Sequence, residues 1–332
     1  MGGWENTPSS AIRMDPNVFI FASVAVLLVG LVLGTIELLI VNRLFARFSF
    51  FKKILFKFLL YSFVLSVIIF ITFMMAAAIE LQTGIFDSRV WNKYLLFFSS
   101  YTHLSTALQM TVSLVASLLY TEISDNIGHG VLLKFFTGKY HSPVQETRIF
   151  MFLDMKASTT IAEQLGHQTY FKMLKAYYAD ISDAIVRHGG EIYQYVGDEI
   201  IVSWKLKDMD QNANCIRCFF AMKADLQKHH DWYRKKFGVM PEFKAGIHPG
   251  EVTTGEIGLV KKDIMFTGDV LNATARIQGL CNEYGVDLLV SGELLDNLQL
   301  NGDFTTSALG SSELRGRKEH VELFTIRKAN DR

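Results

Sequence analysis

The chain has 332 residues, and its 33 Lys and Arg balance its 33 Asp and Glu, so the formal net charge is zero. A neutral chain gives no reason to expect a nucleic-acid partner, and three cysteines are too few for a disulfide scaffold. Half of the residues are apolar, and they are concentrated before about residue 120. This uneven distribution excludes a purely soluble protein and a disordered one.

Three long apolar runs occupy the first part of the chain, at residues 18–41, 54–79 and 95–120. An α-helix rises about 1.5 Å per residue, so each run is long enough to cross a hydrocarbon core of about 30 Å. The first run is too long for a signal peptide, and no small-residue cleavage site follows it. The sequence therefore predicts a transmembrane domain over residues 1–120 with three spanning helices.

Charged residues in the loops predict the orientation in the membrane. The loop between the first two runs contains four bases and no acid, namely Arg43, Arg47, Lys52 and Lys53. The positive-inside rule places this loop in the cytoplasm. Everything after Tyr120 is then expected on the cytoplasmic side of the inner cell membrane. A chain that lacks a first helix would show the same pattern, so both arrangements stay open.

Two features inside the first run bear on helix packing. Gly30 and Gly34 have the GxxxG spacing that lets two helix backbones approach closely. Glu37 is the only charged residue of the run, and we expect it to lie near the cytoplasmic interface, where water solvates it.

Residues 121–145 mix polar residues with glycines and a proline, which predicts a linker to a second domain over residues 146–332. Apolar or alternating runs predict strands over residues 148–155, 191–196, 199–204, 242–247, 251–257, 262–267, 287–291 and 321–326. Helical patterns lie between them, notably over residues 212–236 and 268–280. The order strand-helix-strand-strand-helix-strand predicts an α+β, ferredoxin-like (βαββαβ) fold with its helices on one face of the sheet.

This arrangement brings two acids together. The first strand neighbours the strand that follows the hairpin, so Asp154 at the end of one lies beside Asp198 at the start of the other. Two carboxylates this close repel each other unless they share a cation, and oxygen ligands favour Mg²⁺ or Mn²⁺. Residues 155–160 open a helix next to Asp154, and free N–H groups at a helix start bind phosphate oxygens.

Four segments together resemble the catalytic domain of class III adenylate/guanylate cyclases, as found in membrane-anchored bacterial members. The resemblance covers residues 147–326 and rests on FLDMKASTT (152–160), YQYVGDEIIVSW (193–204), GDVLNATARI (268–277) and ELRGRKEHVELFTI (313–326).

The resemblance implies a reaction in which the 3′-oxygen of a nucleoside triphosphate attacks its own α-phosphorus and displaces pyrophosphate. Asp154 and Asp198, with the backbone of Met155, match the positions that hold two Mg²⁺ or Mn²⁺ ions per site. Asn272 matches the residue that orients the ribose, and Arg276 the arginine that stabilises charge on the phosphate. Further substrate contacts are expected at Lys156, Ala157, Ser158, Thr159, Gly197 and Arg317.

The resemblance also implies a homodimer, because in this family the acids come from one subunit and the Asn/Arg pair from the other. The positions that read the base are Gln194 and Met265, which match neither the usual adenylate nor the usual guanylate residues. We expect ATP as substrate and 3′,5′-cyclic AMP as product. Guanylate cyclase, diguanylate cyclase and a receptor with an inactive cyclase-like dimerisation module are the alternatives.

Overall fold

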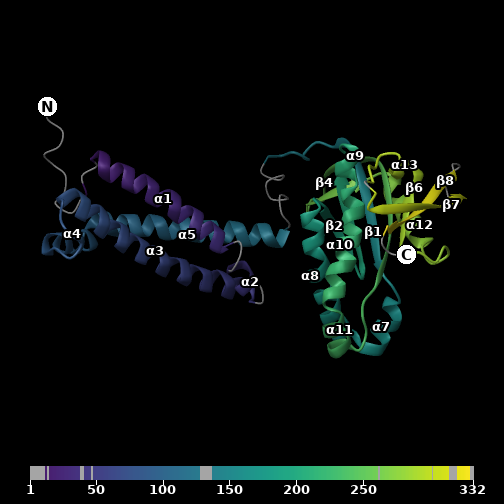
Figure 1. Ribbon diagram of the computed structural model, residues 1–332, viewed down its shortest axis with the longest axis horizontal. Helices are drawn as coiled ribbons and strands as arrows, with labels where there is room; N and C mark the ends of the chain where they lie inside the picture. The colour runs from purple at the N-terminus through teal and green to yellow at the C-terminus, as the bar shows by residue number, and fades with distance from the viewer. Residues whose placement is uncertain are drawn as a thin grey trace. The chain divides into compact units, whose positions relative to one another are not determined.

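The computed structural model describes residues 12, 15–37, 41–45, 48–127, 137–260, 262–300, 302–313 and 320–329. The chain divides into two compact units, Met1–Thr137 and Gly138–Arg332 (Figure 1). The first is helical, and the second combines a mixed β-sheet with helices.

The described helices of the first unit are α1 (Pro16–Ile36), α2 (Asn42–Phe45), α3 (Phe50–Leu81), α4 (Ser88–Phe98) and α5 (Tyr101–Ile127). Among the described residues, three helices are long and apolar enough to cross a membrane, at Pro16–Ile36, Phe50–Leu81 and Tyr101–Ser124. This result confirms the predicted number of spanning helices.

The third apolar run is not one helix in the structure. It is divided at Ser99 and Ser100, and the Ser100 hydroxyl accepts a hydrogen bond of 3.1 Å from the backbone N–H of His103. A serine at this position caps the start of a new helix, so α5 begins at Tyr101. The segment before it, α4, packs back on α3, where the Phe73 and Phe97 rings stack at 4.5 Å.

Ion pairs connect the three long helices. Glu37 accepts a hydrogen bond of 2.7 Å from Lys57 on α3 and another from the Tyr61 hydroxyl. The Lys57 side chain is only 2% exposed. Glu37 is therefore not simply solvated at the interface, as the sequence suggested, because a lysine buried on the next helix needs an anionic partner. Lys53 pairs with Glu122 at 2.8 Å, so the start of α3 and the end of α5 lie at the same end of this unit.

The strands of the second unit are β1 (Val144–Met155), β2 (Glu191–Val196), β3 (Glu199–Lys205), β4 (Phe243–Ile257), β5 (Asp263–Thr267), β6 (Leu288–Ser291), β7 (Phe304–Glu313) and β8 (His320–Lys328). Its described helices are α7 (Ser158–Leu165), α8 (His167–Arg187), α9 (Met209–Asn212), α10 (Asn214–Lys228), α11 (His230–Phe237), α12 (Asp269–Gly279) and α13 (Gly292–Leu295).

The sheet has the order β2-β3-β1-β4-β6-β8-β7, and β5 pairs with β4. Strands β1 to β4, with helices α8 and α10, form the predicted βαββαβ core. Within it, β1 lies between β3 and β4, as expected. Side chains alternate along β1: Met151 and Leu153 pack under α8 and α10, whereas Phe150 and Phe152 face Val270 of α12. Both faces of the sheet are therefore covered by helices, which differs from the predicted single face and explains why β1 is continuously apolar from Ile149 to Leu153.

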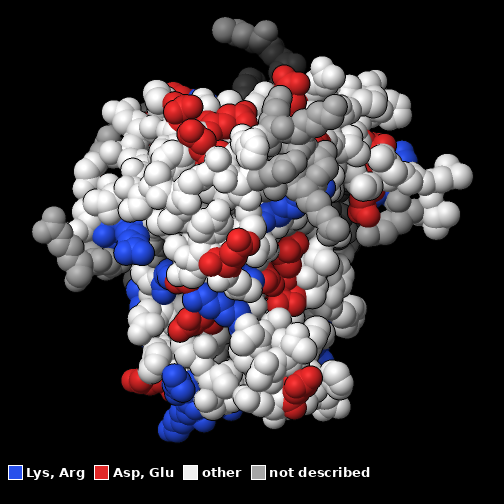
Figure 2. All heavy atoms as spheres, turned by 90° about the vertical axis from the view of Figure 1, so that its right-hand side faces the viewer, with Lys and Arg blue, Asp and Glu red and all other residues white. Residues whose placement is uncertain are grey.

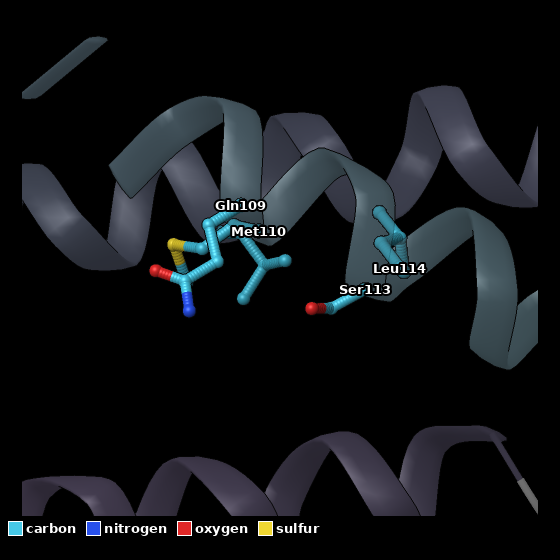
Figure 3. Close-up of a pocket in the computed structure, with 5 residues that line it drawn as sticks. Gln109, Met110, Ser113 and Leu114 are labelled. Atoms are coloured by element: carbon cyan, nitrogen blue, oxygen red, sulfur yellow. The ribbon is translucent and has the colours of Figure 1, made fainter. Parts of the chain in front are cut away.

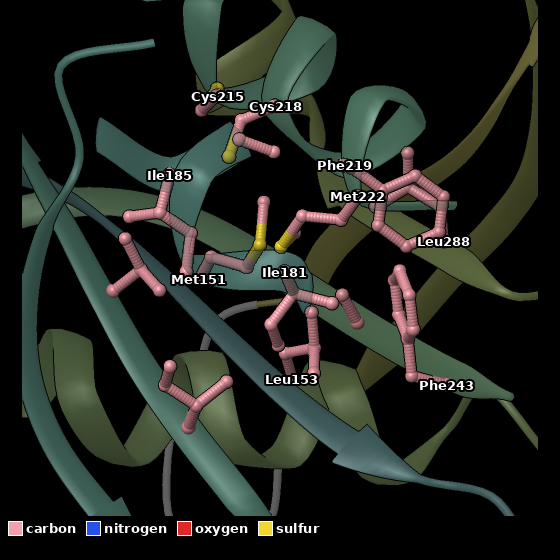
Figure 4. Packing of buried hydrophobic residues seen from close by; sticks show 14 of the residues in the cluster. Met151, Leu153, Ile181, Ile185, Cys215, Cys218, Phe219, Met222, Phe243 and Leu288 are labelled. Atoms are coloured by element: carbon pink, nitrogen blue, oxygen red, sulfur yellow. The ribbon is translucent and has the colours of Figure 1, made fainter. Parts of the chain in front are cut away.

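Two other differences have local causes. The strands expected over residues 242–247 and 251–257 are one strand, β4. Its pairing with β1 is unbroken, from the pair formed by Val144 and Thr254 to the pair formed by Met155 and Phe243. The helix expected over residues 212–236 is divided into α9, α10 and α11. Cys215 and Cys218 of α10 point into the core beside Ile185 and Met222, as Figure 4 shows, and all three cysteines of the chain are free and buried.

Candidate active site

The two predicted acids meet at one corner of the sheet. Asp154 is the second-last residue of β1, and its register partner on β3 is Glu199. Asp198 directly precedes Glu199 in the turn between β2 and β3. Gly197 in this turn has a φ of 64°, which favours glycine, and its carbonyl accepts a 2.9 Å hydrogen bond from the Tyr178 hydroxyl. The turn is thus fixed where it presents Asp198 to Asp154.

Burial and the neighbouring carboxylates both disfavour the ionised acids at this corner. Burial raises the pKa of Asp154 above the ordinary aspartate range, and Asp198 raises it further through its charge and a shared hydrogen bond. Lys244 and Gln278 act in the opposite direction, with Lys244 Nζ 3.5 Å and Gln278 Nε2 3.2 Å from Asp154 Oδ2. Burial also raises the pKa of Glu199, followed by the charges of Asp154 and Asp198. A divalent cation would relieve this repulsion.

The donor set fits Mg²⁺ or Mn²⁺. The corner offers carboxylate oxygens, which these hard cations prefer. In the part of the chain that the structure describes, no group of three or more His, Cys, Asp or Glu side chains is arranged to hold a metal. The protein would therefore supply only part of a coordination shell, and substrate oxygens and water would complete it, as is usual for Mg²⁺ at phosphate sites.

The segment after Asp154 forms a strained turn into α7. Ala157 has a φ of 52°, a left-handed conformation that non-glycine residues adopt at a cost, and no side chain caps the helix that starts at Ser158. The first-turn N–H groups around Ser158 and Thr159 are thus available to an anion. The Lys156 ammonium instead pairs with Asp287 at 2.5 Å and with Glu242 at 3.4 Å. The Lys156 backbone N–H also donates to the Glu242 carbonyl at 2.8 Å, so neither its charge nor its N–H is free at this turn.

Helix α12 presents Asn272 and Arg276 on its outer side. Ala273 and Ile277 are fully buried against the sheet, whereas Asn272 is exposed and Arg276 is partly exposed. Within the described residues neither of these two side chains has a hydrogen-bond or ion-pair partner. Gln278 of the same helix contacts Asp154, but at about 100° per residue Asn272 and Arg276 lie roughly 120–160° away from it around the axis. No described contact brings them to the acids of their own chain.

The two base positions lie on β2 and β5, which are not paired in the sheet but contact each other through side chains. Gln194 on β2 is exposed and Met265 on β5 is 38% exposed. The residues beside them, Tyr193 and Phe266, hold the two strands together with ring centroids 4.8 Å apart. Arg317 lies outside the described residues.

With this geometry established, comparison with known proteins decides the family. Residues 140–328 match the family model described as the adenylate and guanylate cyclase catalytic domain. The chain belongs to this family.

Several known proteins are similar to this chain. "Adenylate cyclase 2" of Rhizobium meliloti is 33% identical over 204 residues, which are 61% of this chain and 56% of that protein. The adenylate cyclase of Anabaena cylindrica is 27% identical over 184 residues, or 53% of this chain and 36% of that protein. The chain therefore spans about half or less of these relatives. The solved structure of the adenylyl cyclase CyaB from P. aeruginosa superposes with a TM-score of 0.51 at 18% identity, covering 57% of this chain and 98% of that one, and supports the fold.

Two residues of the cyclase unit were not expected from the sequence. Lys244 on β4 is only 9% exposed and contacts both Asp154 and the side-chain oxygen of Asn282, the latter at 3.1 Å. Gln278 is likewise buried beside Asp154. Neither belongs to a recognisable motif, because only the β1–β4 register places Lys244 opposite Asp154. Among the described residues on the face shown in Figure 2, acidic and basic side chains are interspersed.

Proposed function

We propose that this protein is a membrane-anchored adenylate cyclase that converts ATP to 3′,5′-cyclic AMP and pyrophosphate at sites shared by two copies. The observation that carries the proposal is the separation of the site within one chain. Asp154 and Asp198 meet at the end of β1, while Asn272 and Arg276 stand on the outer side of α12 without partners among the described residues. In a dimer, Asn272 and Arg276 of each copy would lie at the Asp154 and Asp198 pair of the other copy.

The acid half would hold the metal ions. Asp154, Asp198 and the backbone of Met155 are the ligands that we propose. When bound, two Mg²⁺ or Mn²⁺ ions supply Lewis-acid chemistry that lowers the pKa of the 3′-hydroxyl and neutralises the phosphates. The free N–H groups of the turn at Ala157, Ser158 and Thr159 would bind phosphate oxygens beside them.

The α12 half would position the nucleotide. Asn272 would hydrogen-bond the ribose and fix the direction of the 3′-oxygen. Arg276, four residues later on the same side of α12, would donate to the α-phosphate oxygens as negative charge builds on them. The bond from the 3′-oxygen to the α-phosphorus forms as the α–β phosphoanhydride bond breaks, and the 3′-hydroxyl proton is released with pyrophosphate. Arg317 is the proposed contact to the terminal phosphates.

ATP is the proposed substrate because the relatives from Rhizobium and Anabaena are named adenylate cyclases. Gln194 and Met265 would read the base, since both are accessible and the strands that carry them contact each other through Tyr193 and Phe266. The Gln194 amide both donates and accepts, so it is able to bind adenine.

The cyclase unit is proposed to lie in the cytoplasm, below the inner membrane. The Lys53–Glu122 pair places the end of α5 at the same end of the bundle as the start of α3. The chain therefore leaves the bundle on the side of the basic loop before α3, which the positive-inside rule assigns to the cytoplasm.

Product analysis tests this proposal. Purified full-length protein is incubated with Mn²⁺ or Mg²⁺ and equal concentrations of ATP and GTP, and the cyclic products are separated and identified. We expect cyclic AMP to predominate, with no product from an Asp198→Ala control. Predominant cyclic GMP would identify a guanylate cyclase, and no cyclic product under either metal would favour an inactive dimerisation module.

A further inference from the structure

The outer face of α5 differs from the lipid-facing sides of the other two long helices. Six small or polar residues form this face: Thr102, Ser105, Thr106, Gln109, Ser113 and Ser117, and all of them are exposed. We call this set the α5 polar face. By contrast, most exposed positions of α1 and α3 are large and apolar, as at Val26 (73% exposed), Leu27 (67%) and Phe63 (69%), although Gly30, Gly34 and Ser66 are exposed as well. Hydrocarbon suits the latter side chains but not the α5 polar face.

The rotation of α5 about its own axis is fixed by its contacts with α3. Leu118 is 8% exposed, and Glu122, 5% exposed, pairs with Lys53 at 2.8 Å. At about 100° per residue these two lie roughly 140–180° from Ser113 and Gln109. The α5 polar face therefore lies away from the Leu118 and Glu122 contacts with α3. At the level of Gln109 and Ser113 it borders an open groove beside Leu65 of α3, and its outer side would meet the membrane interior.

Gln109 makes this exposure costly. The hydroxyls of Ser105 and Thr106 donate to the carbonyl of Thr102 one turn earlier, at 3.0 and 2.8 Å, so they are satisfied within the helix. Gln109 has no such hydrogen bond to any described residue. It lies about 12 Å along the helix from Tyr101, within the apolar span. An unpaired amide at this depth drives association with another helix.

A groove lies beside this face. It has a volume of about 420 Å³ and is lined by Gln109, Met110, Ser113 and Leu114 of α5 and by Leu65 of α3. Figure 3 shows the Gln109 amide and the Ser113 hydroxyl directed to the same side of α5. The small Ser113 side chain leaves room for the backbone of an approaching helix.

We propose that the α5 polar face is the contact between the membrane units of two copies of this chain, with Gln109 hydrogen-bonded to the same residue of the second copy. Two copies inserted in the same direction are related by a two-fold axis along the membrane normal, which sets α5 parallel to its equivalent and each residue near itself. A side-chain amide both donates and accepts, so Gln109 is complementary to itself. This contact does not depend on the cyclase reaction.

Disulfide cross-linking of the full chain in its native membrane tests the contact. Ser113→Cys places a thiol on the α5 polar face. Thr111→Cys is the matched control, because Thr111 is an exposed hydroxyl residue on the same helix but roughly 160° around the axis from Ser113. The native cysteines at 215, 218 and 281 are buried, so their background is low. After mild oxidation we expect a covalent dimer with Ser113→Cys at least about fivefold more abundant than with Thr111→Cys.

A second variant measures the amide directly. Gln109→Leu in the Ser113→Cys chain should reduce the cross-linked fraction by about three- to thirty-fold, whereas Leu108→Ile, on the apolar flank of α5, should leave it unchanged. Equal cross-linking at positions 111 and 113 would overturn the proposal. Two other results would also overturn it. One is efficient cross-linking of a Gly34→Cys chain, which would place the contact on the open glycine face of α1. The other is cross-linking of the Ser113→Cys chain to a different protein. No nucleotide is present, so the result is independent of whether the chain is a cyclase.

Discussion

The acid corner and the outer side of α12 are opposite in character. At the corner, Asp154 is partly buried and held by Lys244 and Gln278 of its own chain, yet its pKa is raised because burial and Asp198 disfavour its charge. On α12, Asn272 and Arg276 have no partner among the described residues. One half of the site is thus assembled and electrostatically strained within the chain, while the other half is accessible to a second molecule. The following experiments test this difference.

Removing either acid should have the largest effect. Asp154→Ala or Asp198→Ala should lower kcat by at least about 10³-fold, which corresponds to about 4 kcal/mol, because the metal ions would lose a ligand that nothing nearby replaces. Asp231→Ala is the control, since that carboxylate is fully exposed on α11. Initial rates of cyclic-nucleotide formation provide the measurement. Activity within tenfold of wild type would remove the acid from the metal site.

Mixing two inactive chains should restore activity if the halves come from different copies. Asp198→Ala and Arg276→Ala each inactivate both sites of their own homodimer. In an equal mixture about half of the dimers are mixed, and each of these has one intact site of two, so activity should recover to about a quarter of wild type. Co-expression with two affinity tags isolates the mixed dimers. Verified mixed dimers without activity would argue against a shared site.

Neutralising Asp154 should stabilise the metal-free protein. A raised pKa means that the folded state binds the proton more tightly than the unfolded state, so the contribution of Asp154 to stability is present at low pH and is lost as pH rises through its folded pKa. At neutral pH without metal, Asp154→Asn should therefore raise the free energy of unfolding by about 0.5–2 kcal/mol.

Thermal denaturation in the presence of a chelator measures this gain, and adding Mn²⁺ should stabilise the wild type but not the variant. The Mn²⁺ affinity of the wild type should also fall as pH is lowered, starting above the ordinary aspartate range, because protons compete for Asp154. An identical melting temperature for both chains in chelator would show that the corner is not strained.

The smallest effect is expected at the base position. Gln194→Lys should raise the ratio of kcat/KM for ATP to that for GTP by up to about tenfold, because a lysine donates hydrogen bonds, as an acceptor on adenine requires, but cannot accept them. Gln211→Lys, on exposed α9, serves as the control. Competition between the two nucleotides gives the ratio, and an unchanged value would place Gln194 outside the base pocket.

The sequence by itself determined the elements whose signal is local. Apolar runs long enough to cross a membrane identified three spanning helices, and strand and turn patterns identified the βαββαβ core. Because the order of these elements fixes which strands are neighbours, the meeting of Asp154 and Asp198 was also predictable.

Only the tertiary structure decided the contacts between distant segments. The β1–β4 register placed Lys244 at Asp154, helix packing buried Lys57 against Glu37, and the rotation of α5 on α3 directed Gln109 outward. These outcomes depend on register and on rotation about helix axes, which side chains from several elements determine together. A lone lysine or glutamine in the sequence therefore carries no signal of where it will lie.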